Sequence, residues 1–374
     1  MKKDSIHAQN FVQIFEQFAP KQFAVEGDKN GLMIGTLNKK IKNVMIALDV
    51  LEETIDEAIE KEVDFILAHH PLLFRPLKQI NLDTTIGRII KKAIEHNITI
   101  YAAHTNLDVA SGGVNDLLAE KLKLESPKVL VETYKEAMQK IVVFVPADYA
   151  SQVRSALGEA GAGYIGSYSH CSFSTEGTGS FYPEKEANPH IGKVGSQEYV
   201  DEVRIETIIP TRLSRPVIAS LVKAHPYEEP VYDLYPLDEP YEKMGLGRIG
   251  KVAAGYTLRT YVDFVKRALN IENVRVVGDL NAPIKKAAVL GGDGNKYVSQ
   301  AKRAGADVLI TGDLYYHVAQ DALMEGMFVI DAGHHIESIM KEGLATKLIT
   351  LLDKEGYDIS VFASVPSTEP FRFM

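Results

Sequence analysis

The feature that most limits the fold is an alternation of short apolar runs with amphipathic helical stretches near both ends of the chain. In the first third, β-branched runs at 43–50, 64–70 and 98–108 are separated by helical patterns at 51–63 and 85–97. Runs this short and apolar are typical of strands buried on both faces. The alternation therefore predicts an α/β fold with mainly parallel strands joined by right-handed crossovers.

The last third repeats this scheme, with apolar runs at 287–293, 307–313 and 327–335 and helical stretches between them. The run 64–70 resembles 307–313 in pattern, and 98–108 resembles the segment that begins at 327. We therefore expect two related α/β halves. A length of 374 residues is enough for two or three domains with an ample core.

Residues from about 127 to 243 follow a different order of patterns. A strand pattern begins at 140 and is followed by a helix pattern. An alternating Gly- and Ser-rich arm comes next, and then a strand, a helix and a last strand pattern that ends at 237. Two βαβ units around a hairpin predict a ferredoxin-like α+β module. The expected division is 1–126 for the first half of the core, 127–243 for an inserted domain and 244–374 for the second half.

Composition and charge remove several classes of protein. Hydrophobic residues make up 45% of the chain and charged residues 24%, as in an ordinary globular protein, and no apolar run is long enough for a transmembrane helix. The net charge of −9 repels a phosphate backbone, so nucleic acid is not an expected partner. The single cysteine, Cys171, excludes an intrachain disulfide and a cysteine-rich zinc site. With no targeting segment visible, we expect a cytoplasmic protein.

Three of the predicted strands end in histidine-rich segments. These are His69 and His70 before Pro71, the segment His104 to Asp108, and the segment Gly333 to Glu337. In open α/β sheets, ligands bind beyond the carboxyl ends of the strands, so up to five histidines and two carboxylates are expected in one crevice. This set suits Zn, Mn, Fe or Ni and could hold two ions that share a carboxylate. For each histidine alone, a hydrogen-bonded core position is the alternative.

Weaker candidates lie at neighbouring strand ends. Asp49, Asp313 and His317 could orient ligating rings or act as acid–base groups, and helix capping is the alternative for the two aspartates. The string GLGRIG at 245–250 matches the dinucleotide fingerprint but lacks a clear strand before it and a helix after it. The string GGDGN at 291–295 could offer backbone N–H groups to a phosphate or form a tight turn.

Several strings together resemble the Nif-three-like family, whose bacterial members are named GTP cyclohydrolase I type 2 homologues. They cover nearly the whole chain: EGDKNGLMIG, ALDV, FILAHHP, AAHTNLD, GLGRIG, TGDLYYH, GHHIE and STEPF. The resemblance implies a centre of two divalent metal ions, with Zn²⁺ as the first expectation. The ligands that it implies are His69, His70, Asp108, His334 and Glu337, and it leaves open whether His335 contacts metal. It also implies a toroidal homohexamer with the metal sites facing an internal cavity.

The segment 127–243 resembles the PII/CutA-like module of the longer members of this family. Its string KAHPYEEP, at 223–230, is similar to the His-Pro-Tyr-Glu string of CutA proteins. Two interpretations stay open for this string, a structural element or a regulatory ligand site.

These observations support one leading hypothesis and two rivals. The leading one is a metal-dependent hydrolase acting on a nucleotide-like small molecule, with His104 or His317 carrying protons near pH 7. The GTP cyclohydrolase activity follows from the family name alone. The rivals are a metal-handling or regulatory protein without turnover, and an interaction scaffold.

Overall fold

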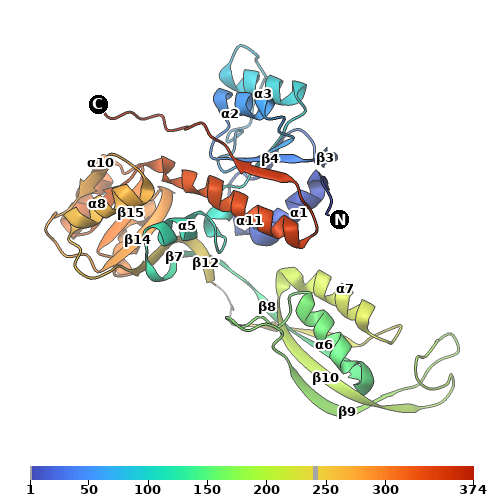
Figure 1. Ribbon diagram of the computed structural model, residues 1–374. Helices are drawn as coiled ribbons and strands as arrows, with labels where there is room; N and C mark the ends of the chain where they lie inside the picture. The colour runs from blue at the N-terminus through green and yellow to red at the C-terminus, as the bar shows by residue number, and fades with distance from the viewer. Residues whose placement is uncertain (1, 239–242) are drawn as a thin grey trace. The chain divides into compact units, whose positions relative to one another are not determined.

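The computed structural model describes residues 2–238 and 243–374 (Figure 1). The chain divides into two compact units, Met1–Tyr134 with Met244–Met374, and Lys135–Lys243. The first unit contains a five-stranded and a six-stranded sheet, and the second contains a four-stranded sheet. The protein is therefore a mixed α/β protein, as the sequence predicted. No helix within the described residues is long and apolar enough to span a bilayer.

The first sheet has the strand order β17–β4–β5–β6–β2, and all neighbouring pairs are parallel except β2 with β6. Its strands are β2 (Gly31–Ile34), β4 (Asn43–Ala47), β5 (Phe65–Ala68), β6 (Thr99–Ala102) and β17 (Ser360–Ala363). A short antiparallel pair, β1 (Ile6–His7) with β3 (Lys40–Ile41), precedes the first parallel strand of this sheet in the chain.

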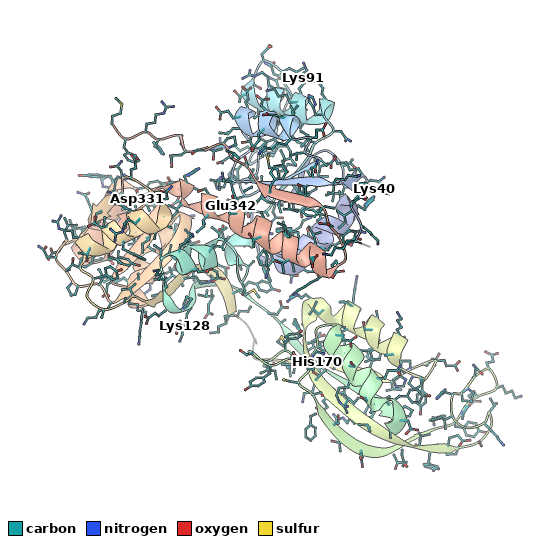
Figure 2. The ribbon with its side chains drawn as sticks, viewed as in Figure 1. Lys40, Lys91, Lys128, His170, Asp331 and Glu342 are labelled. Atoms are coloured by element: carbon teal, nitrogen blue, oxygen red, sulfur yellow. The ribbon has the colours of Figure 1, made fainter. Side chains whose placement is uncertain are left out.

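Helices cover both faces of this sheet, which explains why its strands are continuous apolar runs. Alternate residues such as Met45 and Ile66 pack under α2 (Glu52–Glu60) and α3 (Thr85–Glu95). Their neighbours Val44 and Phe65 face α1 (Ala8–Phe18) and α11 (Met340–Lys354) (Figure 1). Charged side chains such as Lys91 on α3 and Glu342 on α11 lie outside the core (Figure 2).

The second sheet has the order β13–β16–β15–β14–β12–β7, with β14, β15 and β16 mutually parallel. Its strands are β7 (Glu125–Lys135), β12 (Lys243–Lys251), β13 (Arg275–Val277), β14 (Lys286–Asp293), β15 (Val308–Gly312) and β16 (Phe328–Asp331). Its helices are α4 (Thr105–Val109), α5 (Val114–Lys121), α8 (Leu258–Leu269), α9 (Val298–Arg303) and α10 (Tyr316–Glu325). One continuous hydrophobic core joins this sheet to the inner face of the first sheet.

The same local device starts the central strands of both sheets. The Asp64 carboxylate, before β5, accepts hydrogen bonds from the N–H groups of Lys42 and Asn43 at 2.7 and 3.0 Å. The Asp307 carboxylate, before β15, accepts bonds from two successive N–H groups at the start of β14, at 2.8 and 2.9 Å. In each half, an aspartate therefore fixes the register of the neighbouring parallel strand.

The glycines of the string at 245–250 serve strand packing. The string lies inside β12, where a Cβ on Gly245 would lie 1.8 Å from the Val131 carbonyl oxygen of β7. Arg248, in the same string of β12, is buried and forms an ion pair with Asp116 of α5. The expected domain boundary at 126/127 falls inside β7, which belongs to the six-stranded sheet.

The second unit is a four-stranded antiparallel sheet in the order β11–β8–β10–β9. Its elements are β8 (Met138–Pro146), α6 (Ala150–Glu159), β9 (Phe173–Phe181), β10 (Glu198–Pro210), α7 (Ser214–Ala224) and β11 (Tyr232–Leu237). Its own hydrophobic core lies between the two helices and the sheet, where Val143 and Ile205 meet Val153 and Leu221. This unit therefore has what an independently packed module needs.

Candidate metal centre

Three strands of the first unit are followed directly by side chains that can ligate metal. The segment that follows β5 contains His69 and His70. The segment that follows β6 contains His104 and then, in α4, Asp108. Chain leaving β16 enters a 3₁₀ helix, His334–Ile339, which carries Glu337. The two sheets thus contribute ligand-bearing segments from their carboxyl ends to one crevice.

The Glu337 carboxylate is the centre of this cluster. Its Oε2 atom lies 3.0 Å from His70 Nε2, 3.2 Å from His334 Nε2 and 3.6 Å from His69 Nε2. Single ligand atoms of His69, His70 and Glu337 all lie within 4.8 Å of one another. On the other side of His69, Asp108 Oδ1 lies 3.7 Å from the same Nε2 atom. The structure therefore brings together all five residues expected as ligands.

The Nδ1 atom of each of these imidazoles is held by an oxygen outside the cluster. His69 Nδ1 lies 2.9 Å from the Ala103 carbonyl oxygen. His70 Nδ1 lies 2.7 Å from Asp49 Oδ1, and His334 Nδ1 lies 2.6 Å from Asp313 Oδ2. A hydrogen bond at Nδ1 fixes the ring, so that the other nitrogen, Nε2, faces the cluster and presents its lone pair there once it has lost its proton. The alternative of helix capping for Asp49 and Asp313 is not observed, since α2 and α10 begin after Leu51 and Tyr315.

Two buried polar atoms of the cluster have no hydrogen-bond partner among the described residues. They are His69 Nε2 and Asp108 Oδ1, which face each other across 3.7 Å. The His69 side chain is fully buried, and unpaired polar atoms at such depth are costly unless a bound species completes their coordination. An imidazole nitrogen and carboxylate oxygens are suitable ligands for Zn²⁺ and similar ions. The residues present therefore fit a divalent metal.

The electrostatics of the cluster match a site built for positive charge. Burial opposes protonation of His70, but hydrogen bonds to Asp49 and Glu337 raise its pKa to about 10. The hydrogen bond to Glu337 raises the pKa of His334 to about 9 against its burial. Burial raises the pKa of the Asp108 carboxyl to about 6. In the metal-free protein, protons on the imidazoles supply the charge that balances the buried carboxylates.

Two successive glycines of β14 make room for the cluster. A Cβ on Gly292, where φ is +68°, would lie 2.8 Å from Glu337 Oε1 and 3.3 Å from His334 Nε2. A Cβ on Gly291 would lie 3.0 Å from the same Glu337 atom. The string GGDGN therefore serves close approach of Glu337 as well as the turn that the sequence suggested.

The remaining histidine candidates are placed differently from one another. The His104 ring lies 5.4 Å from the His69 ring and 5.8 Å from the His70 ring, between centroids. The His317 side chain is exposed on α10, where its Nδ1 lies 3.2 Å from Gln320 Oε1. In the described part of the chain it makes no hydrogen bond or ion pair with the cluster. His335 Nε2 is buried with no hydrogen-bond partner in the part of the chain that the structure describes, and burial lowers the pKa of this histidine.

Sequence reasoning missed two residues that support the cluster. Asp28 Oδ1 lies 2.6 Å from His104 Nδ1, and Asp28 Oδ2 accepts hydrogen bonds from Thr105. Thr368 donates a hydrogen bond of 2.5 Å to Asp49 Oδ2, behind His70. Both residues lie in strings that resemble the family, EGDKNGLMIG and STEPF. That membership was the available signal, but neither residue follows a predicted strand.

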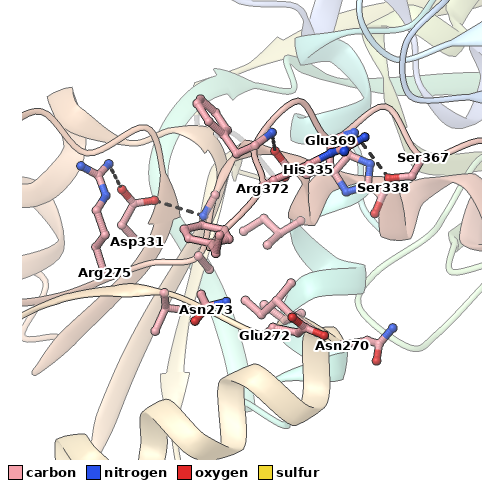
Figure 3. Close-up of a pocket in the computed structure, with 18 of the residues that line it drawn as sticks. Asn270, Glu272, Asn273, Arg275, Asp331, His335, Ser338, Ser367, Glu369 and Arg372 are labelled. Atoms are coloured by element: carbon pink, nitrogen blue, oxygen red, sulfur yellow. Dashed lines mark hydrogen bonds and ion pairs between the residues drawn. The ribbon is translucent and has the colours of Figure 1, made fainter.

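A cavity of about 840 Å³ lies beside the cluster (Figure 3). Its wall includes Asp313, which bonds His334, and His335. Arg275, paired with Asp331, and Arg372 of the C-terminal segment also line it. The Arg372 side chain makes no ion pair among the described residues. The cavity thus joins the edge of the cluster to a guanidinium that is free to bind an anion.

The fold and the site define a mixed α/β protein with a histidine–carboxylate cluster suited to metal. The family model Duf34/NIF3 (NGG1p interacting factor 3) matches residues 6–370. The chain belongs to this family.

Relatives match over nearly the full length. The GTP cyclohydrolase 1 type 2 homolog of Bacillus subtilis (strain 168) is 55% identical over 370 residues, covering 99% of this chain and 99% of that protein. The crystal structure of a Bacillus cereus protein related to NIF3 is 52% identical with a TM-score of 0.92, covering 98% of this chain and 99% of that one. A Staphylococcus aureus crystal structure is 33% identical with a TM-score of 0.74, covering 99% of each chain.

Proposed function

We propose that this protein is a metal-dependent hydrolase with a centre of two divalent ions, acting on a nucleotide-like substrate. The observation that carries the proposal is the pair of buried, unpartnered atoms His69 Nε2 and Asp108 Oδ1 beside Glu337. A cation coordinated by these atoms would satisfy both of them. The name that the Bacillus subtilis relative carries, a homolog of GTP cyclohydrolase 1 type 2, supports a nucleotide as the first substrate to test.

The proposed ligands are Glu337 and the four residues grouped with it: His69, His70, Asp108 and His334. Glu337 is suited to be shared between ions, because one of its oxygens lies within 3.6 Å of three imidazole nitrogens. Zn²⁺ is the first candidate, and Mn, Fe or Ni also suits this ligand set. When bound, such ions supply Lewis acidity and activation of water near neutral pH.

His104 is the proposed proton carrier of this chain. Asp28 holds its Nδ1, so the ring keeps one orientation and its Nε2 can exchange a proton with a substrate. Its ring contacts those of His69 and His70, which puts that proton close to the proposed ions. His317, the second candidate from the sequence, is the weaker one because it is bonded to Gln320 on the exposed side of α10.

The cavity of Figure 3 is the proposed substrate site. Arg372 is suited to bind a phosphate or carboxylate, and Asn270 and Asn273 can bond polar groups of a base or sugar. A substrate bound in this cavity would approach the cluster from the side where His335 and Asp313 line the cavity wall.

The first test is elemental analysis of protein purified without added metal or a polyhistidine tag. We expect about two equivalents of metal per chain in wild type, and loss of both in a His69→Ala/Asp108→Ala double variant. His96→Ala is the matched control, because His96 is an exposed histidine at the end of α3. Loaded wild type is then screened with GTP, other nucleotides and phosphoesters. Wild type that holds no metal and takes up neither Zn nor Mn contradicts the proposal.

A second candidate function is metal handling or regulation without turnover. It is favoured by the partial exposure of the His70 and His334 side chains, 23% and 39%, through which ions could exchange. Rapid exchange of bound metal, together with no hydrolysis of any substrate in the panel, would select this function over hydrolysis.

We also propose that the second unit, Lys135–Lys243 of the segment 127–243, is a ferredoxin-like, PII/CutA-like module inserted between two related α/β halves. The strand order β11–β8–β10–β9, with α6 after β8 and α7 after β10, supports the module. The shared roles of Asp64 and Asp307 support related halves.

We propose further that the chain forms a homohexamer. Support comes from the edge strand β9, whose Phe173 is 68% exposed, and from Tyr199 of β10, which is 73% exposed. Edge strands with exposed apolar groups are commonly covered by another subunit. Light scattering after size-exclusion chromatography tests this, and a monomer at micromolar concentration contradicts it.

A further inference from the structure

The second unit contains a cavity of its own, of about 430 Å³, which the proposed hydrolase does not use. It is lined by β9, by the excursion 182–197 between β9 and β10 (Figure 1), by β10 and by the segment that follows α7. That last segment contributes Tyr227, Glu228 and Glu229, the second half of the string KAHPYEEP. The volume falls in the range of small-molecule sites.

Aromatic rings form one side of this cavity. The ring of Tyr227 lies 5.9 Å from that of Phe181, edge to face, and 6.4 Å from that of His190. His190 in turn lies 5.4 Å from Tyr149. Ring faces grouped in this way attract cations through the aromatic quadrupole and also contact apolar groups.

Carboxylates supply all the formal charge of the lining. Glu202, Glu228 and Glu229 line the cavity, and neither lysine nor arginine is among the described residues that do so. Glu229 makes no hydrogen bond or ion pair in the described part of the chain. An anion such as a nucleotide phosphate would meet three carboxylates and neither lysine nor arginine among the described lining residues, whereas a cation would find unpaired carboxylate oxygens.

The local structure holds two of these carboxylates in place. Tyr227 Oη donates a 3.0 Å hydrogen bond to Glu202 Oε1. Glu202 Oε2 lies over Gly179, where a Cβ would come within 2.2 Å of it, so the glycine makes room for the carboxylate. Glu228 Oε1 accepts a 3.0 Å bond from the Asn188 N–H, which ties the excursion to the segment after α7. Glu202 and Glu228 are therefore positioned before any ligand arrives.

We infer that this cavity binds a small organic cation with an apolar body, of the alkyl amine or alkyl guanidine class. The carboxylates take the charged head through charge-assisted hydrogen bonds, and the rings of Phe181 and Tyr227 cover the alkyl chain. This assignment makes the string KAHPYEEP part of a ligand site of the insert. It is independent of the metal centre.

The probe is agmatine, which carries both an amine and a guanidine, titrated calorimetrically into full-length protein in the presence of a chelator. We expect saturation at about one equivalent per chain. Glu202→Gln and Glu229→Gln should each weaken binding about fivefold or more, because each removes one charge while keeping the side-chain shape. Glu176→Gln is the matched control, since Glu176 is exposed on β9 outside the cavity. It should leave the dissociation constant within about twofold.

Two further arms separate the alternatives. Putrescine against guanidinium ion distinguishes recognition of the amine from recognition of the guanidine, and binding of either supports the cation site. ATP is expected not to bind this unit. The inference is overturned if agmatine gives no heat at millimolar concentration, if Glu202→Gln and Glu229→Gln both bind it as wild type does, or if ATP binds and Glu202→Gln strengthens that binding. Thermal unfolding of each variant verifies that it is folded.

Discussion

Asp108 Oδ1 and His69 Nε2 face each other 3.7 Å apart in the interior, and within 2–238 and 243–374 neither atom has a hydrogen-bond partner. Each residue is held from behind. His69 is bonded to the Ala103 carbonyl oxygen, and the backbone of Asp108 is tied to the buried Asn115 side chain. Because the His69 ring is held and the Asp108 backbone is anchored beside it, a bound proton or cation between the two atoms would relieve this arrangement.

The first prediction concerns Asp108→Asn. Burial raises the pKa of the Asp108 carboxyl to about 6, so its ionised form costs the metal-free fold stability at neutral pH. This cost is absent near pH 4 and grows as pH rises towards 6. We expect metal-free Asp108→Asn to be more stable than metal-free wild type at pH 7 by about 2 kcal/mol, with little difference near pH 4.

The same variant should bind metal more weakly than wild type, because an amide oxygen carries no charge. Denaturant unfolding with and without Zn²⁺, at both pH values, checks both effects. A metal-free variant less stable than wild type at pH 7 would show that the carboxylate is not under strain there.

The second prediction concerns protons released on metal binding. The pKa values of His70 and His334 are raised to about 10 and about 9, so both rings are charged in metal-free protein at pH 7. Ligation needs the neutral ring, so metal binding must expel their protons. We expect proton release at pH 7, measured by calorimetry in buffers of different ionisation enthalpy, and less release as pH approaches 10.

These raised pKa values also set the sign of the stability change. The stabilisation that the charged rings give the metal-free fold is complete below about pH 6.5 and is lost as pH rises through 9 to 10. Metal-free protein should therefore become less stable to heat over that interval, while metal-loaded protein changes less. Equal slopes for the two forms would contradict this account.

The third prediction separates the two proton-carrier candidates, once a substrate is found. His104→Ala should lower kcat by about 10²-fold or more with metal content unchanged, as expected for a general acid or base. Asp28→Asn should lower kcat less and shift its pH profile, because Asp28 acts by holding His104. His317→Ala should stay near wild type, since its side chain is bonded to Gln320. If His317→Ala lost most of its kcat while His104→Ala kept the wild-type kcat, the assignment would be reversed.

The fourth prediction tests the glycine that admits Glu337. Gly292→Ala should lose about 1 to 2 kcal/mol of stability from positive φ and, in addition, bind metal more weakly because its Cβ would lie 2.8 Å from Glu337 Oε1. Gly326→Ala is a matched control, with φ +70° and nothing within 4 Å of the added Cβ. It should lose comparable stability and keep wild-type metal affinity. Equal affinity loss in both variants would rule out the contact with Glu337 as the cause.

Local pattern was enough to predict the mixed α/β class and where the buried strands begin, but the run 98–108 was wrong in its second half, where 105–109 form α4. Residues 43–47, 65–68 and 99–102 are strands because β-branched runs between helices bury both faces of a parallel sheet. Pattern also led to His69, His70 and Glu337, because each lies just beyond such a strand. The same reasoning gave His317 equal standing with His104, although only His104 contacts the cluster rings.

The sequence by itself determined which apolar runs form strands and which ligand types follow them, since those depend on neighbours along the chain. Only the tertiary structure decided which ends meet. Glu337 reaches His70 across 267 positions and His104 reaches Asp28 across 76, because one core packs the inner faces of both sheets together. The packing of the buried sheet faces brings those strand ends together. Hydrophobic periodicity in the sequence specifies that one face of a strand or helix is buried, but not which other element will cover that face.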